Sequence, residues 1–368
     1  MTGLKSLLTT SAAAVALAAT LGAPATAADI AYATHIPSTN VTVEPALKPW
    51  AERLAEHDIN VNFFWGGTVA KHGAMPPAIR DGLADMGFMA DLYGAQDLPN
   101  SVLVTNLPLV NLDARVMTAV AAEARMIGCE GCEEELAEFG AFNYNVFSLP
   151  SQYLMCREPV ANLAQLEGKK VRATGVLGRM LAKWGAVPVA MPVTDGYEAL
   201  ERGQVDCTTG IDTFIMDYSW WDSAKYILDM PLGLFAGVLT MMSESKFESL
   251  SEEQQKAMLA ERARLAADSA YAYFAEGEKA RKLAVEEHGV TFLEPEDDIK
   301  AKLEEARIAE RDEDLAQSQK LGAKDPEARI ANVVALAEKW QKIVDETGGD
   351  KEALIEAMER EIYSKVQP

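Results

Sequence analysis

Residues 184–207 read WGAVPVAMPVTDGYEALERGQVDC, and this stretch indicates the fold class of the chain. Val187–Val193 is an apolar run that predicts a strand, and Asp195–Gly203 has the pattern of a short helix. Residues 204–211 (QVDCTTGI) then predict a second strand. Strands that alternate with helices in this way are typical of α/β proteins with largely parallel sheets.

The same alternation continues upstream of this stretch. Residues 168–174 (GKKVRAT) predict a strand, and residues 175–185 predict a helix. Near the start of the chain, strands and helical segments alternate at 29–36, 43–56, 59–65, 75–82 and 84–90. Neither G-x-x-x-x-G-K-[ST] nor G-x-G-x-x-G occurs, so nucleotide binding has no support.

Two similar β/α units imply two lobes. We expect lobe I at residues 28–150, with part of 234–295 returning to it, and lobe II at residues 151–233. Only short crossings connect the units, around FSLPSQYLMCREP (147–159) and PLGLFAGVLT (231–240). These crossings are consistent with two hinge strands.

The composition changes after Ser243, where Glu, Lys and Ala dominate with helical periodicity. This pattern predicts one long helix over 243–287 and a helical extension over 296–368. Long polar helices of this kind usually brace domains from outside.

The first 27 residues have the organisation of a signal peptide. Lys5 supplies a positive charge, Ser11–Leu21 is apolar, and Ala25-Thr26-Ala27 forms a small-x-small cleavage site. A membrane anchor is the alternative, but the apolar run is shorter than the roughly 20 residues that span a bilayer. We therefore expect cleavage after residue 27 and a periplasmic protein.

The charge balance excludes some partners. The 368 residues include 34 Lys and Arg against 56 Asp and Glu, a net charge of -22. Nucleic acids and anionic membrane surfaces are poor partners for such a field. An anionic ligand would need a specific buried cation, which directs attention to individual arginines.

Export changes the meaning of the four cysteines, because an oxidising compartment favours disulfides. Cys129 and Cys132 form a C-x-x-C motif before an acidic helix, so a structural disulfide is favoured over a redox centre. Cys156 and Cys207 lie in strand-like runs and could link neighbouring strands. The sequence leaves three pairings open.

The four histidines show no ligand spacing that would complement a zinc site, so no metal is expected.

Several motifs together resemble the periplasmic substrate-binding proteins of tripartite ATP-independent periplasmic (TRAP) transporters, of the C4-dicarboxylate-binding (DctP-like) type. The matching segments, in chain order, are DIAYATHIPSTN (29–40), PAIRDGLADMGF (77–88), LAQLEGKKVRATG (163–175), WGAVPVAMPVTDGYEALERGQVDC (184–207) and SLSEEQQKAML (249–259). The resemblance covers nearly the whole chain after the signal peptide. It implies a two-lobe α/β fold, type II-like among periplasmic binding proteins, with hinge strands and bracing C-terminal helices.

The resemblance also implies a small organic solute, usually a carboxylate, in the cleft between the lobes. Arg172 in KKVRATG matches the family arginine that pairs with the ligand carboxylate. A planar guanidinium can donate two parallel hydrogen bonds to such a group. An exposed arginine in a surface salt bridge is the alternative.

The chain departs from the family pattern at residues 207–212 (CTTGID). Gly210 stands where the family often has Asn, so Thr209 or Asp212 would have to supply a polar contact. Asp212 would repel a second ligand carboxylate, which favours a monocarboxylate over a dicarboxylate. The alternative is that Asp212 caps a helix over residues 213–218.

Aromatic residues at expected strand ends and loops are candidates for the walls of the cleft. His35 follows the first strand and could donate a hydrogen bond to the ligand. Two or three rings could instead form a cage for a quaternary ammonium or sulfonium group. The aromatic candidates are Trp65, Tyr93, Tyr153, Phe214 and Trp220.

No catalytic motif stands out, since G-x-S-x-G and H-E-x-x-H are both absent. We expect a solute receptor that needs no cofactor, is monomeric and delivers its ligand to the membrane subunits of a TRAP permease. A zwitterionic ligand, or a role as the partner of a sensor, remains an alternative. If a dicarboxylate bound most tightly, Arg179 and Lys71 would be the first candidates for a second ligand-binding cation.

Overall fold

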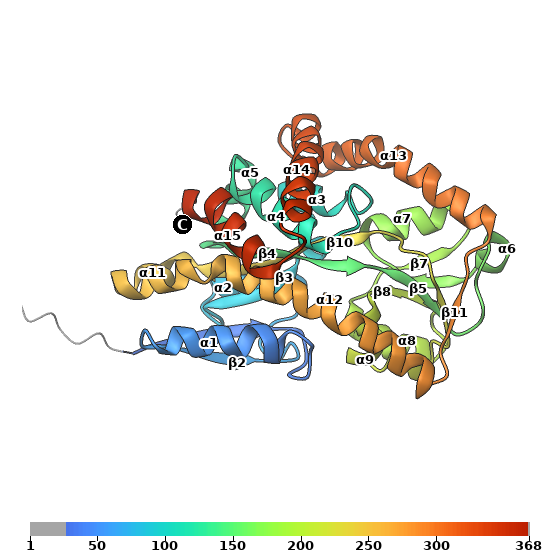
Figure 1. Ribbon diagram of the computed structural model, residues 1–368, viewed down its shortest axis with the longest axis horizontal. Helices are drawn as coiled ribbons and strands as arrows, with labels where there is room; N and C mark the ends of the chain where they lie inside the picture. The colour runs from blue at the N-terminus through green and yellow to red at the C-terminus, as the bar shows by residue number, and fades with distance from the viewer. Residues whose placement is uncertain (1–26, 367–368) are drawn as a thin grey trace, which may run out of the picture.

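The computed structural model describes residues 27–366, and the signal peptide expected at 1–27 lies almost wholly outside this range. Each of the two lobes is built around one sheet, and helices cover both sheets (Figure 1). The two-lobe α/β fold expected from the sequence is confirmed. No helix in the range 27–366 is long and apolar enough to cross a membrane.

Lobe I contains a five-stranded sheet in the order β2-β1-β3-β10-β4. Its strands are β1 (Ala28–Thr34), β2 (Ile59–Phe64), β3 (Met86–Ala90), β4 (Ala141–Ser151) and β10 (Leu234–Ser243). The connecting helices are η1 (Val43–Leu47), α1 (Lys48–Ala55), η2 (His72–Ala74), α2 (Met75–Arg80), η3 (Asp91–Gly94), α3 (Pro99–Thr105), α4 (Ala114–Met126) and α5 (Glu130–Ala137). All five residues of β3 are buried, as the apolar run in the sequence predicts. Met75 packs so closely on β3 that a Cβ at Gly87 would lie 2.1 Å from the Met75 sulfur.

Lobe II contains a six-stranded sheet in the order β11-β9-β5-β8-β6-β7. Its strands are β5 (Tyr153–Cys156), β6 (Lys170–Arg172), β7 (Val187–Val189), β8 (Cys207–Gly210), β9 (Tyr226–Leu228) and β11 (Thr291–Leu293). Its helices are α6 (Leu163–Leu166), α7 (Gly175–Lys183), η4 (Val193–Asp195), α8 (Gly196–Glu201), α9 (Asp212–Asp217) and η5 (Trp220–Asp222). Strand β7 is an edge strand and stops at Val189, earlier than expected, which suits its internal Pro188.

Both sheets are mixed, so the expectation of largely parallel sheets was wrong. Strands β1, β2 and β3 are parallel, but β10 runs antiparallel to β3 and β4. In lobe II, β5 is antiparallel to β8 and β9. The reason is that β4, β5, β9 and β10 flank the two crossings, and the outgoing and returning strands run in opposite directions.

The two crossings are hydrogen-bonded to each other between the lobes. The Gln152 N–H donates to the Gly233 carbonyl at 2.8 Å, and the Leu232 N–H donates to the Gln152 carbonyl at 2.9 Å. Gly233 has a φ of 121°, and a Cβ there would lie 2.7 Å from Pro108. This paired strand segment is the hinge between β4–β5 and β9–β10.

The single long helix expected over 243–287 is three helices: α10 (Glu244–Glu248), α11 (Glu252–Ala260) and α12 (Arg262–Glu286). The break has a local cause, because Ser251 and Gln254 form a capping box that starts α11. Helix α12 runs along both lobes (Figure 1). Its Ala266 packs in the lobe I core and its Ala280 in a lobe II core.

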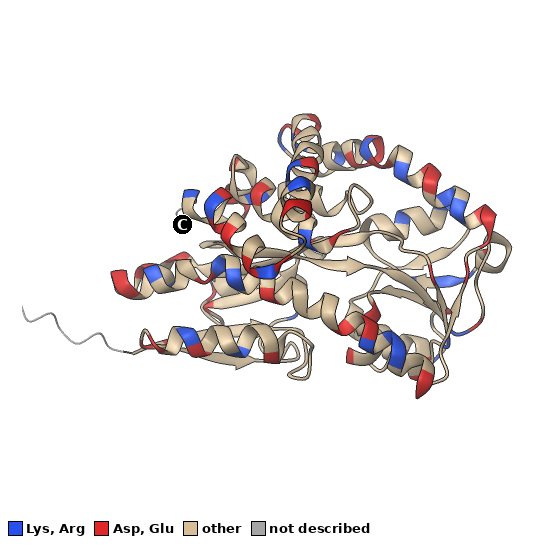
Figure 2. Ribbon diagram, in the orientation of Figure 1, with Lys and Arg blue, Asp and Glu red and all other residues tan. Residues whose placement is uncertain are grey.

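The C-terminal extension belongs to the body of the molecule. Helix α13 (Asp297–Leu321) leads back from lobe II to lobe I, where α14 (Pro326–Glu346), α15 (Lys351–Glu361) and η6 (Tyr363–Lys365) pack. Trp340 is fully buried in the lobe I core. Charged residues gather on α12 to α15, whereas the strands carry few (Figure 2).

The disulfides expected from the sequence are confirmed. Cys129 pairs with Cys132 at the start of α5, and Cys156 pairs with Cys207. Cys156 and Cys207 stand directly opposite each other on the antiparallel strands β5 and β8. The second bridge therefore joins neighbouring strands of lobe II.

Candidate functional site

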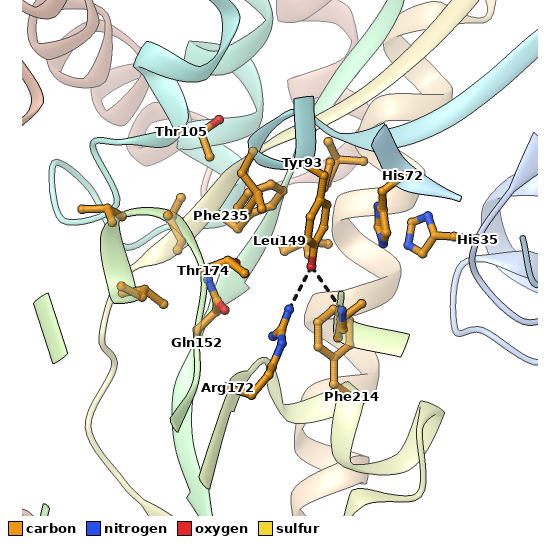
Figure 3. A pocket seen from close by; sticks show the side chains of 18 of the residues that line it. His35, His72, Tyr93, Thr105, Leu149, Gln152, Arg172, Thr174, Phe214 and Phe235 are labelled. Atoms are coloured by element: carbon orange, nitrogen blue, oxygen red, sulfur yellow. Dashed lines mark hydrogen bonds between the residues drawn. The ribbon is translucent and has the colours of Figure 1, made fainter. Parts of the chain in front are cut away.

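A cavity lies between the two lobes at the hinge, and we call it the interlobe cavity (Figure 3). Lobe I, the hinge strands, lobe II and α12 all contribute to its wall. The lining residues are His35, Ile36, His72, Phe88, Ala90, Leu92, Tyr93, Thr105, Asn106, Leu149, Gln152, Arg172, Thr174, Gly175, Val176, Leu177, Val193, Phe214, Tyr218, Leu234, Phe235, Val238 and Tyr273. Within the described range, Arg172 is the only Lys, Arg, Asp or Glu on this list.

Arg172 is the last residue of β6, and its side chain is buried. Strand β6 runs parallel to both of its neighbours, so its carboxyl end faces the crevice where ligands bind in open α/β sheets. Its Nε donates to the Met191 carbonyl and its Nη1 to the Thr209 carbonyl, each at 3.1 Å. These two backbone acceptors hold the guanidinium in place.

The third bond of Arg172 crosses the cleft. Its Nη2 donates to the hydroxyl oxygen of Tyr93 at 2.8 Å, and the same oxygen accepts from the Val193 N–H at 3.2 Å. Tyr93 belongs to η3 of lobe I, whereas Arg172 and Val193 belong to lobe II. A guanidinium has five N–H groups. One N–H on each terminal nitrogen therefore remains for a ligand.

Two histidines of lobe I line the same cavity. His35 and His72 are 6% and 4% exposed, and their ring centroids lie 3.5 Å apart. The His72 ring also packs on Tyr93, with 4.3 Å between centroids. Burial lowers the pKa of His35 to about 3 and, with the nearby His35 and Arg172, that of His72 to about 2. Both imidazoles are therefore neutral at physiological pH.

A second polar contact between the lobes lies beside the cavity. The Asn40 amide of lobe I donates to the Asp217 carboxylate of α9 at 2.9 Å. Tyr273 of α12 donates to the Asn40 side-chain oxygen at 3.3 Å. Burial raises the pKa of Asp217 to about 7, and the nearby Glu276 adds to the increase. The contact between the lobes thus holds a carboxyl group in a site that disfavours its charge.

The structure brings four of the sequence-predicted site residues to the interlobe cavity: Arg172, Tyr93, His35 and Phe214. Arg172 is buried, so the alternative of an exposed surface salt bridge does not apply.

Three aromatic candidates lie elsewhere. Trp65 stacks on Phe63 in lobe I, at 4.7 Å between centroids. Tyr153 lines a separate groove along α12, where the Arg281 guanidinium lies 4.6 Å from its ring. Trp220 is fully buried in a core of lobe II. None of these three rings lines the interlobe cavity in this structure.

The residues at 209–212 also have other roles. The Thr209 side chain is buried; its backbone carbonyl accepts from Arg172 Nη1, and its hydroxyl donates to the Arg172 carbonyl at 3.5 Å. A Cβ at Gly210 would lie 2.5 Å from the Trp220 ring, so glycine is needed there for packing. Asp212 forms an ion pair with Arg281 at 2.9 Å, outside the interlobe cavity. It is the first residue of α9, whose N-cap is Ile211, so the alternative that Asp212 caps this helix was wrong.

Sequence reasoning missed His72, Gln152, Thr174 and Tyr218. The position of Gln152 in a predicted hinge crossing could have indicated its place. The sequence position of His72 did not indicate a place at the cavity. We considered this histidine only as a possible metal ligand. No group of three or more metal-binding side chains occurs among residues 27–366. The proposed second cations, Arg179 and Lys71, do not line the cavity.

Two lobes that close on a buried arginine, joined by a paired hinge, define a solute-binding protein. The family model of the bacterial extracellular solute-binding proteins, family 7 (DctP), matches residues 33–316. The chain belongs to this family, and the resemblance to TRAP solute-binding proteins is confirmed.

Solved TRAP solute-binding proteins share this fold. One from Bordetella bronchiseptica with bound (R)- and (S)-mandelate is 19% identical, with a TM-score of 0.74 over 84% of this chain and 99% of that one. A marine metagenome protein specific for aromatic acid ligands, in complex with metahydroxyphenylacetate, is 22% identical, with a TM-score of 0.76 over 85% and 99%. One from Rhodoferax ferrireducens with copurified benzoate is 16% identical, with a TM-score of 0.75 over 86% and 99%.

Proposed function

We propose that this protein binds a small organic acid with one carboxylate and an apolar or aromatic body in the interlobe cavity, and delivers it to a TRAP permease. The observation that carries this proposal is Arg172, a buried cation with two unused N–H groups in a cavity lined otherwise by uncharged side chains. A carboxylate paired with this guanidinium would receive two parallel, charge-assisted hydrogen bonds.

The rest of the cavity suits an apolar body. Phe88, Leu149, Phe214 and Phe235 supply apolar surface on both sides of the hinge. Burial raises the pKa of Tyr218 far above its ordinary value, so its phenol stays neutral. A second ligand carboxylate would lose its hydration without meeting a second cation. Mandelate, benzoate and metahydroxyphenylacetate, found in the related structures, each have one carboxylate and a ring.

A zwitterionic or quaternary ammonium ligand is less well supported. Such a ligand needs an anion or an aromatic cage for its cation. No Asp or Glu of the described range lines the cavity, and Asp212 is engaged with Arg281 outside it. The cavity therefore favours an anionic ligand.

Transport and location complete the proposal. The signal sequence expected at 1–27 and the family both support export to the periplasm, where the monomeric receptor would meet its permease. Closure is favoured because one ligand contacts both lobes at once. No catalysis is part of this function. A sensor role would use the same site, and permease genes beside this gene would argue for transport.

The test is calorimetric titration of mono- and dicarboxylates with aromatic and aliphatic bodies. We expect an aromatic monocarboxylate to bind more tightly than succinate or malate. Arg172→Gln should lose about 2–5 kcal/mol of binding free energy, because the ligand charge is left unpaired. Arg202→Gln is the matched control, since Arg202 is an exposed arginine of the same lobe and should bind normally. Unchanged affinity in Arg172→Gln, or tightest binding of a dicarboxylate, would contradict the proposal.

A further inference from the structure

His72 presents two buried nitrogens that have no use within the protein. Neither Nδ1 nor Nε2 has a hydrogen-bond partner among the described residues, and the side chain lies on the wall of the interlobe cavity. His35 Nδ1 is also without a partner in residues 27–366. Buried polar groups are rarely left unpaired in native proteins, because desolvation without a hydrogen bond is costly. These nitrogens therefore point to a ligand group.

The two imidazoles lie at a defined place relative to Arg172. His35 packs on His72 with the rings tilted, His72 packs on the Tyr93 ring, and the Tyr93 hydroxyl accepts from Arg172 (Figure 3). The Tyr93 side chain therefore lies between the two imidazoles and the Arg172 guanidinium. A ligand that lies alongside Tyr93 could reach Arg172 with one end and the histidines with the other.

The chemistry of the pair selects the ligand group. A neutral imidazole offers one N–H donor and one lone-pair acceptor. A hydroxyl can donate to one of these nitrogens and accept from another. A carboxylate can only accept, and it would be desolvated beside rings that carry no charge.

We propose that His35 and His72 form a hydroxyl-binding subsite, so that the ligand is a hydroxylated aromatic monocarboxylic acid with its carboxylate on Arg172. This inference rests on the proposed function and narrows it to one ligand class. His72, with both nitrogens free, is the main specificity-determining residue.

The experiment compares hydroxy acids with their parent acids by calorimetric titration. The first series of probes is benzoate and the three hydroxybenzoates. The second series is phenylacetate, the three phenylacetates hydroxylated on the ring, and mandelate. In the wild type, the best hydroxy acid should bind about tenfold or more tightly than its parent, because the parent leaves buried nitrogens unpaired. His72→Phe keeps a ring against Tyr93 but removes both nitrogens. It should reduce the preference to about threefold or less, with little change for the parent acid.

Two further variants keep the result interpretable. His72→Gln retains a donor and an acceptor, and should recover part of the preference. His57→Phe makes the same change at an exposed histidine and should bind as the wild type does. Thermal unfolding of each variant reports whether it folds, and the preference ratio is independent of the active fraction.

The outcomes separate the two proposals. Equal affinity for hydroxy and parent acids, or a preference that survives in both His72→Phe and His35→Phe, would overturn the hydroxyl subsite while leaving the proposed function intact. If neither these acids nor any aliphatic monocarboxylate binds, or if Arg172→Gln binds them normally, the proposed function itself fails and the subsite fails with it.

Discussion

Arg125 of lobe I and Arg172 of lobe II are both buried, and they have opposite surroundings. In lobe I, Arg125 donates to Asp91 at 2.8 Å, and neither side chain is exposed. In lobe II, Arg172 has only uncharged partners: two backbone carbonyls and the Tyr93 hydroxyl. A buried charge without a counter-ion is expensive. Arg125 therefore completes a core, whereas Arg172 can pair with an anionic ligand.

The disulfides differ between the lobes as well. The lobe I bridge joins cysteines that are 3 residues apart, and the lobe II bridge joins cysteines that are 51 apart. The first constrains a single turn at the start of α5, whereas the second ties two strands of the ligand-binding sheet together. Lobe II therefore relies more on its covalent link.

The largest effect should come from the lobe I ion pair. Arg125→Leu leaves the Asp91 carboxylate buried and unpaired, and should lower the free energy of unfolding by about 3–5 kcal/mol. Urea-induced unfolding followed by circular dichroism measures this change. The double variant Arg125→Leu/Asp91→Leu should recover much of the loss. We expect removal of Arg172 to affect mainly ligand binding. If Arg125→Leu were as stable as the wild type, the predicted difference between the two arginines would be wrong.

The disulfides provide the next comparison. Replacing both Cys156 and Cys207 by Ala should cost about 4 kcal/mol of stability in the loop-entropy account, against about 2 kcal/mol for Cys129 and Cys132. Urea unfolding of the two double variants measures the order. A greater loss of stability from removing the Cys129–Cys132 bridge would contradict the prediction that lobe II depends more on its disulfide.

A smaller effect is expected at the contact between the lobes. Tyr93→Phe removes the oxygen that accepts from Arg172 and Val193, while the ring remains against His72. The closed form should lose about 1 kcal/mol, so ligand affinity should fall about fivefold. Calorimetry measures the affinity, and small-angle scattering reports the closed fraction without ligand. Unchanged values in both would show that this bond does not contribute to closure.

The smallest effect concerns pH. The closed structure raises the pKa of Asp217 from 3.8 to about 7, so closure takes up a proton wherever the open form has Asp217 ionised. Closure is therefore favoured at low pH and weakens as the pH rises from about 4 to about 7. Ligand affinity should therefore be higher at pH 5 than at pH 8.

Asp217→Asn keeps the contact with Asn40 and removes the titration, so its affinity should vary less over that range. Titration in buffers with different ionisation enthalpies measures the proton uptake directly. Identical pH profiles for the wild type and Asp217→Asn would exclude this carboxyl group as the cause. Glu276 is the charged neighbour to test next.

Much of the fold was predictable from local patterns. The alternation of strands and helices, the two crossings and the motif around Arg172 all follow from short stretches of sequence. The break between α10, α11 and α12 was missed, although Ser251 and Gln254 have the spacing of a capping box. The mixed sheets were missed because strand direction depends on how the chain returns through the hinge.

The site was predictable only in part. Arg172 could be identified because a linear motif contains it. Trp65, Tyr153 and Trp220 were assigned to the cleft from their positions at expected strand ends and loops, and that position does not tell a cavity wall from a core. Gly210 was interpreted as a missing amide, whereas the Trp220 ring requires the absence of a side chain there.

By itself, the sequence determined the two-lobe α/β class, the family, the strand that ends in Arg172 and the cysteines available for pairing. These features depend on local periodicity and on motifs that lie within a few dozen residues. Only the tertiary structure decided that His72, Tyr93 and Arg172 meet in one row, and that Asp212 faces Arg281 and not the cavity. The physical reason is that closure joins side chains about a hundred residues apart on different lobes, through contacts that no local pattern encodes.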